Sequence, residues 1–105
     1  MIKVSILYPN KPASHFDADY YVNVHMPLAI KLLGPALKGV TTEIGIAGGA
    51  PGQPPPFAAI ATITCDSVQS FSESFAPHST ELMADIPNYT DIEPVIQISE
   101  IRISQ

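Results

Sequence analysis

The chain has 105 residues, of which 46% are hydrophobic and 14% are charged, so it can form one domain with a substantial core and few surface charges. Its net charge is −5 and its five basic residues are scattered, which argues against nucleic acid and anionic membranes as partners. A single cysteine excludes an intrachain disulfide. Because the sequence also has no signal-peptide pattern and no membrane-spanning apolar run, we expect a cytoplasmic protein.

The N-terminal part of the sequence predicts a strand followed by a helix. Residues 2–8 alternate between two faces, with apolar side chains at every second position. Asp17 suits a helix N-cap, because its carboxylate can accept hydrogen bonds from free backbone N–H groups. Four residues around and after this cap recur at helical spacing and form one predicted apolar stripe: Phe16, Tyr20, Val24 and Leu28.

Pro27 lies inside this predicted helix. Proline has no N–H to donate to the carbonyl of Asn23, and its ring clashes with the preceding turn. We therefore expect the helix to kink or restart at residues 25–27 and to end at Gly34 and Pro35.

The remaining elements follow from alternation, caps and breakers. In chain order they are a strand over 40–47, a Gly/Pro-rich loop over 48–56, a strand over 57–65, a helix capped by Asp66 or Ser67 and interrupted at Pro77, a turn-like segment over 85–94, and a strand over 95–103. The order strand, helix, strand, strand, helix, strand is typical of the α+β, ferredoxin-like βαββαβ fold. Its four-stranded antiparallel sheet would carry both helices on one face.

The last strand has large apolar side chains on both faces. Ile96 and Ile98 lie on one side, and Val95, Ile101 and Ile103 lie on the other. A strand with one solvated face alternates between apolar and polar residues, so both faces of this sheet are expected to be buried. Together with the low charge content, this predicts a homodimer in which two sheets pack face to face.

Four motifs resemble the EthD family, and together they span most of the sequence: residues 6–9 (ILYP), 16–21 (FDADYY), 25–28 (HMPL) and 85–90 (DIPNYT). The resemblance implies a single domain over residues 1–105, a homodimer of the dimeric α/β-barrel type, and a small cavity between the helices and the sheet. Relatives in that superfamily include cofactor-free oxygenases, isomerases and haem-binding enzymes, so the fold does not select one reaction. The sequence departs from the family pattern at residues 76–78 (APH) and in its long proline-rich loop.

His25 is the predicted catalytic residue. It lies at the proline kink, where a side chain can be directed into a cavity, and imidazole suits acid–base chemistry near neutral pH. The alternative is structural, with His25 donating a hydrogen bond to the backbone carbonyl that the proline leaves free.

We expect a mostly apolar pocket between the first helix and the sheet. Its predicted lining is Tyr20 or Tyr21, Val24, His25, Leu28 and Gln97, with Tyr89 and Asn88 near its mouth. Adjacent residues of a helix point in different directions, so at most one of the paired tyrosines faces the pocket. Tyr20 on the apolar stripe also fits a core position, and Asn88–Tyr89 also fits an ordinary turn.

Three functions remain open. The first is a cofactor-free enzyme, of oxidoreductase, oxygenase or isomerase type, acting on a small hydrophobic or aromatic metabolite with His25 as acid or base. The second is a binding or accessory protein for a degradative oxygenase system. The third is a haem protein with His25 or His78 as axial ligand. The histidine spacing and the isolated Cys65 predict no other metal site, and no phosphate-binding glycine motif predicts a nucleotide cofactor.

Overall fold

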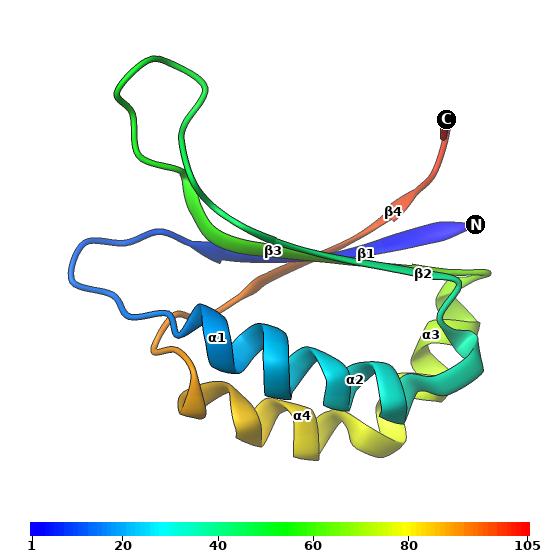
Figure 1. Ribbon diagram of the computed structural model, residues 1–105. Coiled ribbons are helices and arrows are strands. Elements are labelled where there is room, and N and C mark those ends of the chain that lie inside the picture. Colours follow the sequence, from blue (N-terminus) through cyan, green and yellow to red (C-terminus); the bar gives the residue numbers. More distant parts are fainter.

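The computed structural model describes residues 1–105, and its centre is a four-stranded antiparallel sheet with both helical segments on one face (Figure 1). The strands are β1 (Ile2–Pro9), β2 (Gly39–Ile44), β3 (Phe57–Cys65) and β4 (Val95–Glu100). They are arranged in the order β2-β3-β1-β4, and every neighbouring pair is antiparallel. The predicted ferredoxin-like βαββαβ fold is therefore confirmed.

Alternation along the strands separates a helix-covered face from an open face. Val4 and Tyr8 of β1 are buried beneath the helices and lie opposite Ile63 and Ala59 of β3. Leu7, between them in the pleat, is directed to the other side. The alternation predicted for residues 2–8 thus positions the core as expected.

The first helical segment begins at the predicted cap. The Asp17 carboxylate accepts a hydrogen bond from the backbone N–H of Tyr20 at 3.1 Å. The segment comprises α1 (Ala18–Tyr20), the π-helical turn η1 (Tyr21–His25), α2 (Met26–Leu33) and the 3₁₀ turn η2 (Gly34–Ala36). Gly34 ends α2 with a positive φ of 63°, a conformation that favours glycine.

A π turn takes the place of the predicted break at Pro27. The backbone N–H of Met26 donates to the carbonyl of Tyr21, five residues back, and the helix then continues through the proline. The π turn contains one more residue than an α-helical turn, so its hydrogen bonds join residues five apart just before Pro27, which has no N–H to donate. The helix is therefore widened at residues 21–25, where Tyr21 and His25 are both buried.

The buried stripe of this helix differs from the predicted one. The side chains that face the sheet at four-residue spacing are Tyr21, His25, Ala29 and Leu33. Val24 is 45% exposed and Leu28 is half-buried. Two rows of the helix carry apolar residues at the same spacing, and the row that packs toward the sheet contains His25, whose imidazole is paired with Asp85 at the end of α4.

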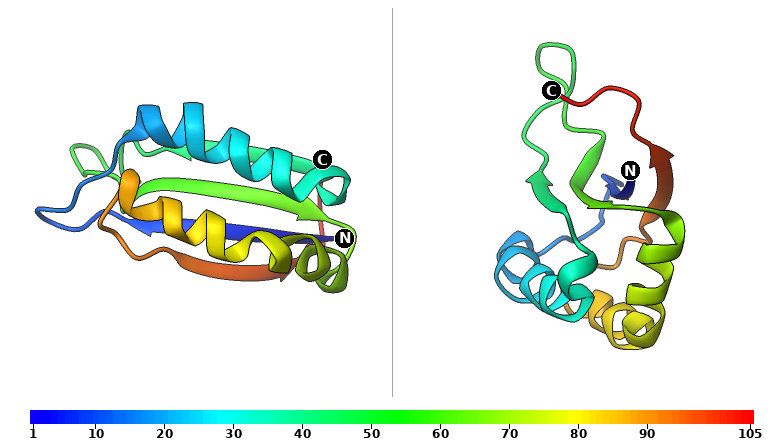
Figure 2. Two further views of the ribbon diagram at one scale, coloured as in Figure 1. Left: turned by 90° about the horizontal axis from the view of Figure 1, so that it is seen from below. Right: turned by 90° about the vertical axis from the view of Figure 1, so that its right-hand side faces the viewer.

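The second helical segment consists of α3 (Val68–Phe75), the 3₁₀ turn η3 (Ala76–His78), α4 (Ser79–Asp85) and the 3₁₀ turn η4 (Ile86–Asn88). Ser67 is its N-cap, since the hydroxyl accepts the backbone N–H of Ser70 at 3.0 Å. Pro77 interrupts the α-helix as predicted, within the 3₁₀ turn. Seen from the helical side, the two segments run side by side across the sheet (Figure 2).

Two parts of the chain rise from the open face of the sheet. They are the loop between β2 and β3 and the C-terminal residues after β4 (Figures 1 and 2). Both neighbouring strands are shorter than predicted, because β2 ends at Ile44 and β4 at Glu100. None of the helices combines the length and hydrophobicity that a membrane crossing needs.

Candidate functional site

An apolar cavity of about 260 Å³ lies between the helical layer and the sheet, and we call it the inner cavity. Fourteen of its 16 lining residues are hydrophobic, and they come from β1, β3, β4 and both helical segments. The lining includes Tyr8, Tyr21 and His25, and the imidazole of His25 is the only nitrogen base among these side chains. A ligand in the cavity would therefore meet one proton-transferring group on an otherwise apolar wall.

The imidazole of His25 is held by Asp85. The side chain of His25 is 10% exposed, and its Nδ1 lies 2.9 Å from Oδ2 of Asp85. Since the carboxylate accepts this hydrogen bond, Nδ1 carries the hydrogen and Nε2 is left with its lone pair. No group of the chain hydrogen-bonds to Nε2, so that nitrogen is free for a ligand.

Asp85 is itself held by two further donors. The hydroxyl of Tyr20 donates to Oδ1 at 2.6 Å, and the side-chain amide of Asn88 donates to the same oxygen at 2.9 Å. Burial by itself would raise the pKa of Asp85, but the hydrogen bonds from Tyr20, Asn88 and His25 outweigh it and lower this pKa. Asp85 therefore stays ionised and keeps its acceptor role toward Nδ1.

A cluster of buried tyrosines fixes the orientation of the imidazole ring. Tyr21 stacks against His25 with ring centroids 5.6 Å apart, and the centroid of Tyr89 lies 4.7 Å from that of His25. The hydroxyls of Tyr8 and Tyr89 share a hydrogen bond of 2.7 Å. Burial raises the pKa of Tyr8, Tyr21 and Tyr89, so all three remain neutral phenols.

Of the predicted pocket residues, only Tyr21 and His25 line the inner cavity. Tyr20 and Tyr89 contact the site without lining the cavity, and Val24, Leu28 and Gln97 lie elsewhere. Val24 and Leu28 belong to the row of α2 and η1 that is turned away from the sheet, as described above. Gln97 lies on the open face of β4, where it is exposed and its amide donates to the hydroxyl of Ser99 at 3.0 Å. Its polar side chain is therefore explained by the open face, and the prediction that it lines the pocket is wrong.

The predicted tyrosines are all near His25, but in different positions. Tyr21 is the member of the adjacent pair that lines the cavity, whereas the hydroxyl of Tyr20 serves Asp85. Tyr89 is fully buried in the core beside His25 and does not close the mouth of the cavity. The predicted alternative for His25 is also corrected, because its Nδ1 bonds to Asp85 and not to a helix carbonyl.

Asp85 is the functional residue that the sequence reasoning missed. It ends α4, where a negative charge is unfavourable because the helix dipole is also negative at its C-terminus. Such a placement signals that the carboxylate has other partners, although their identity depends on how the two helical segments pack. No three His, Cys, Asp or Glu side chains are grouped so that they could hold a metal ion.

Replacing Pro27 with alanine tests whether the proline holds the π turn. The new N–H could donate to the carbonyl of Asn23, so the free energy of unfolding should stay constant or rise by about 1 kcal/mol. The return to regular α-helix would rotate Tyr21 and His25, and affinity for ligands in the inner cavity should fall. Denaturant unfolding and the NMR signals of the His25 ring measure the two effects. Pro35→Ala, at an exposed proline outside the cavity, is the control; an unshifted His25 signal would show that the turn does not depend on Pro27.

Sequence and fold comparisons place this chain among known proteins. The family model described as the EthD domain matches residues 14–93. An EthD-like protein from Ralstonia eutropha JMP134 is 43% identical, with a TM-score of 0.94 over 99% of this chain and 94% of that one. An ethyl tert-butyl ether (EthD) family protein from Bacillus halodurans C-125 is 21% identical, with a TM-score of 0.67 over 97% of this chain and 99% of that one.

A more distant likeness concerns the fold alone. An antibiotic biosynthesis monooxygenase is 14% identical, with a TM-score of 0.53 over 98% of this chain and 100% of that one. No functionally curated protein matches the sequence. The family match covers most of the chain and the 43% identical structure covers nearly all of it, so the protein belongs to the EthD domain family and has the fold of the dimeric α/β-barrel proteins.

Proposed function

We propose that this EthD protein is an enzyme in which His25 transfers a proton to or from a small hydrophobic or aromatic metabolite. One observation carries the proposal: a carboxylate that remains ionised orients the only nitrogen base in the wall of an apolar cavity. Asp85 positions the imidazole and stabilises its protonated form, and Nε2 takes the proton from the ligand. The mostly apolar lining of the inner cavity offers few polar groups to hold water beside the reacting atoms.

The chemistry available to this pair is proton abstraction from a mildly acidic C–H or O–H group. The proton moves to Nε2 and its electron pair stays on the ligand as a carbanion or phenolate. Returning the proton to another carbon is an isomerase-type reaction, and attack of the anion on molecular oxygen begins a cofactor-free oxygenation. Both fit the predicted enzyme class, and both begin with the same step at His25.

The size of the inner cavity supports a small ligand over a haem group. Drug-sized ligands occupy pockets of about 300–1,000 Å³, and the inner cavity, at about 260 Å³, lies just below that range. A macrocycle at His25 would have to displace packed core residues. His78, the other candidate axial ligand, lies in η3 and lines no cavity.

Hydrogen–deuterium exchange of bound ligands tests the proposal without knowledge of the final product. Neutral ring compounds with a weakly acidic C–H, such as 2-indanone and 2-tetralone, would be incubated with the protein in D₂O and followed by NMR. The wild-type protein should accelerate exchange of the acidic C–H. His25→Asn, whose amide can still donate to Asp85, should lower this acceleration by about 10²- to 10⁴-fold while keeping the ligand bound.

His78→Asn is the matched control, because it removes a histidine that touches neither the cavity nor Asp85. It should leave exchange unchanged. If the wild-type protein binds the compounds but accelerates no exchange, the accessory binding function is the better reading. Exchange that survives His25→Asn would assign the proton transfer to another group.

We also propose that the protein acts as a homodimer with the open faces of two sheets in contact. Its accessible surface of 6590 Å² exceeds the value of about 5,700 Å² expected for a compact monomer of this mass. The surplus of about 900 Å² is close to the area of about 800 Å² that each partner buries in a standard interface. The radius of gyration, 14.2 Å, is likewise above the value of about 13 Å for a compact chain of this length.

A further inference from the structure

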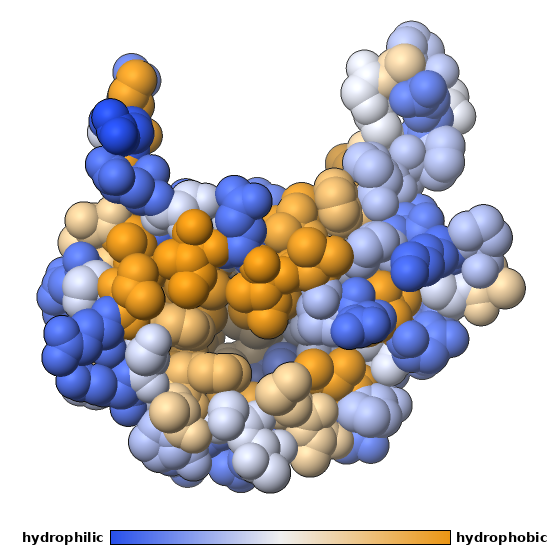
Figure 3. All heavy atoms as spheres, turned by 180° about the vertical axis from the view of Figure 1, so that it is seen from behind, coloured by the Kyte–Doolittle hydropathy of each residue, from blue (hydrophilic) through white to orange (hydrophobic).

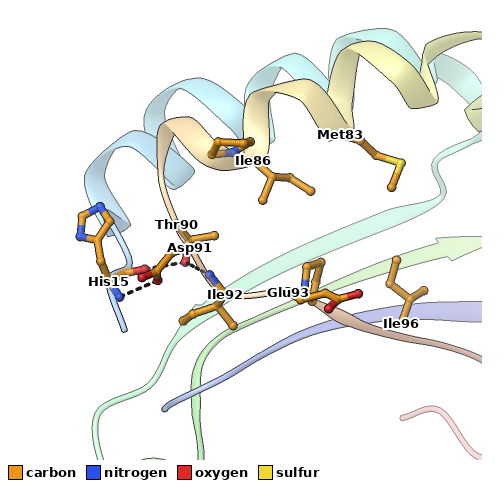
Figure 4. Close-up of a pocket in the computed structure, with 10 residues that line it drawn as sticks. His15, Met83, Ile86, Thr90, Asp91, Ile92, Glu93 and Ile96 are labelled. Carbon is orange, nitrogen blue, oxygen red and sulfur yellow. Dashed lines mark hydrogen bonds between the residues drawn. The ribbon is translucent and has the colours of Figure 1, made fainter. Parts of the chain in front are cut away.

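A second hollow, of about 560 Å³, lies on the surface next to the inner cavity, and we call it the outer basin. It is bounded by the end of α4, by η4 and by the segment that leads into β4 (Figure 4). His15, Thr90, Asp91 and Glu93 provide its polar groups. The proposed chemistry at His25 does not use any of them.

The outer basin and the inner cavity share part of their walls. Four apolar residues line both: Met83, Ile86, Pro94 and Ile96. Met83 and Ile86 point from the second helical segment toward the strand side, and Ile96 faces them across the gap (Figure 4). Met83 and Ile96 are 60% and 58% exposed, so the boundary between the two hollows is accessible to solvent. We call these four residues the threshold.

The same side of the molecule carries an apolar band. Ile96 and Ile98 of β4, on the face that the helices cover, are both more than 40% exposed, and the space-filling view shows apolar side chains gathered here above a hollow (Figure 3). A hydrophobic ligand that reaches this side finds an apolar path across the threshold toward His25. Met83 can adjust to its shape because the methionine side chain is flexible.

The charge around this path has one sign. Asp91 and Glu93 stand in the outer basin, and no Lys or Arg lines either hollow. Asp91 accepts the backbone N–H of His15 at 2.9 Å, whereas Glu93 makes no hydrogen bond or ion pair within the chain. Two carboxylates at the entrance repel an anion and favour a cation or a neutral hydrogen-bond donor.

We propose that the outer basin is the entrance to the inner cavity and selects the ligand by charge. The ligand, which rests on the proposed function for its place beside His25, is an elongated molecule with an apolar body. Its body crosses the threshold into the inner cavity, and its other end, in the outer basin, is a neutral donor or a cation. Ligands with a carboxylate or phosphate at that end are rejected.

Three probes that differ only in one group test this selection: 4-butylbenzylamine, 4-butylbenzyl alcohol and 4-butylbenzoate. Titrations followed by protein NMR at low salt should give affinities in the order amine, alcohol, benzoate, with about tenfold between the first and the last. Glu93→Lys should strengthen benzoate binding and weaken amine binding by about tenfold each, and change alcohol binding by less than about twofold. Raising the salt concentration should reduce the differences in affinity that involve the amine and the benzoate, and should leave the affinity for the neutral alcohol unchanged.

Glu81→Lys is the control, since it makes the same charge change on α4 at an exposed residue outside both hollows. It should change none of the three affinities by more than about twofold. Equal affinities for the three probes, a null effect of Glu93→Lys, or no binding of any probe would overturn the proposal. Failure of the deuterium exchange with the affinity order intact would overturn the catalytic function alone.

The route is tested separately by closing the threshold. Ile96→Trp should weaken binding of all three probes at least tenfold, because the larger ring fills the shared wall. Ile98→Trp, two residues along the same face of β4 and outside both hollows, should have little effect. Should Ile96→Trp fail to fold by circular dichroism, Met83→Trp at an exposed position provides the same test. Unchanged binding in a folded threshold variant would show that ligands enter elsewhere.

Discussion

Asp85→Asn should lower turnover by about 10²- to 10⁴-fold and leave ligand affinity within about threefold. The carboxylate of Asp85 accepts hydrogen bonds from Tyr20, Asn88 and His25 at the same time. An asparagine has one acceptor oxygen, and its amide hydrogens would face donors that need an acceptor. The imidazole would then change its tautomer or its orientation, and Nε2 would no longer be the basic nitrogen in the cavity.

The measurement has to separate this positioning role from a general loss of structure. Nitrogen-15 NMR of the His25 ring should report the hydrogen on Nδ1 in the wild-type protein and a different tautomer in Asp85→Asn. Asp19→Asn is the matched control, because Asp19 is exposed, lines neither hollow and makes no side-chain hydrogen bond. It should preserve both the tautomer and the turnover. Full turnover with an altered tautomer would remove Asp85 from the mechanism.

The same substitution has a defined dependence on pH. The folded-state pKa of Asp85 is lowered, so its ionised form stabilises the fold at pH values above the unfolded pKa of about 3.9. That contribution is lost as the pH falls from about 4 through the lowered folded-state pKa. The difference in unfolding free energy between wild type and Asp85→Asn should therefore be constant near pH 7 and shrink below about pH 4. A difference that grew in acid would contradict the assigned ionisation.

Local sequence signals predicted the fold because each of them acts within a few residues. Alternation over residues 2–8 specified which side of β1 faces the core. The caps, Asp17 and either Asp66 or Ser67, followed from the hydrogen bonds that their side chains can accept, and the structure uses Asp17 and Ser67. Proline positions marked where regular helix had to change. The form of the change at Pro27 was not predictable, since a kink, a restart and a π turn all avoid the missing hydrogen bond.

The candidate site was harder to predict because it depends on contacts between distant segments. His25 was identified from its place beside Pro27, but its partner Asp85 lies 60 residues away. Val24 and Tyr21 belong to rows of similar apolar character, so spacing alone could not decide which row faces the sheet. The position of Gln97 was predicted wrongly for a related reason. A polar residue in an apolar strand indicates a pocket or an open face equally well, and only the strand register shows which face the side chain occupies.

The open face of the sheet carries an apolar row that a homodimer would bury. Val95 of β4 pairs with Leu7 of β1, which pairs with Ile60 of β3, so these three side chains lie in line across the sheet. Beside this row, Gln97 and Ser5 form a paired polar position, which can hydrogen-bond to a facing sheet. The row would meet its own copy across a two-fold axis, as isologous dimers require.

Val95→Glu should dissociate this dimer. Each dimer would bury two carboxylates without partners, at a combined cost of at least about 4 kcal/mol, which raises the dissociation constant about a thousandfold. Light scattering at micromolar concentration should then show one chain mass for the variant and two for the wild-type protein. Loss of the partner should also lower the melting temperature, because the apolar row becomes permanently exposed to water.

Val24→Glu provides the matched comparison. Val24 and Val95 are exposed to a similar extent in the single chain, at 45% and 54%, but they lie on opposite layers of the molecule. If the protein were a monomer, the two substitutions would be equally harmless, because both side chains would point into solvent. If the open faces pack together, only Val95→Glu places a charge inside an interface. A wild-type protein of single-chain mass, or two variants that both remain dimeric, would show that the sheets do not meet through this row.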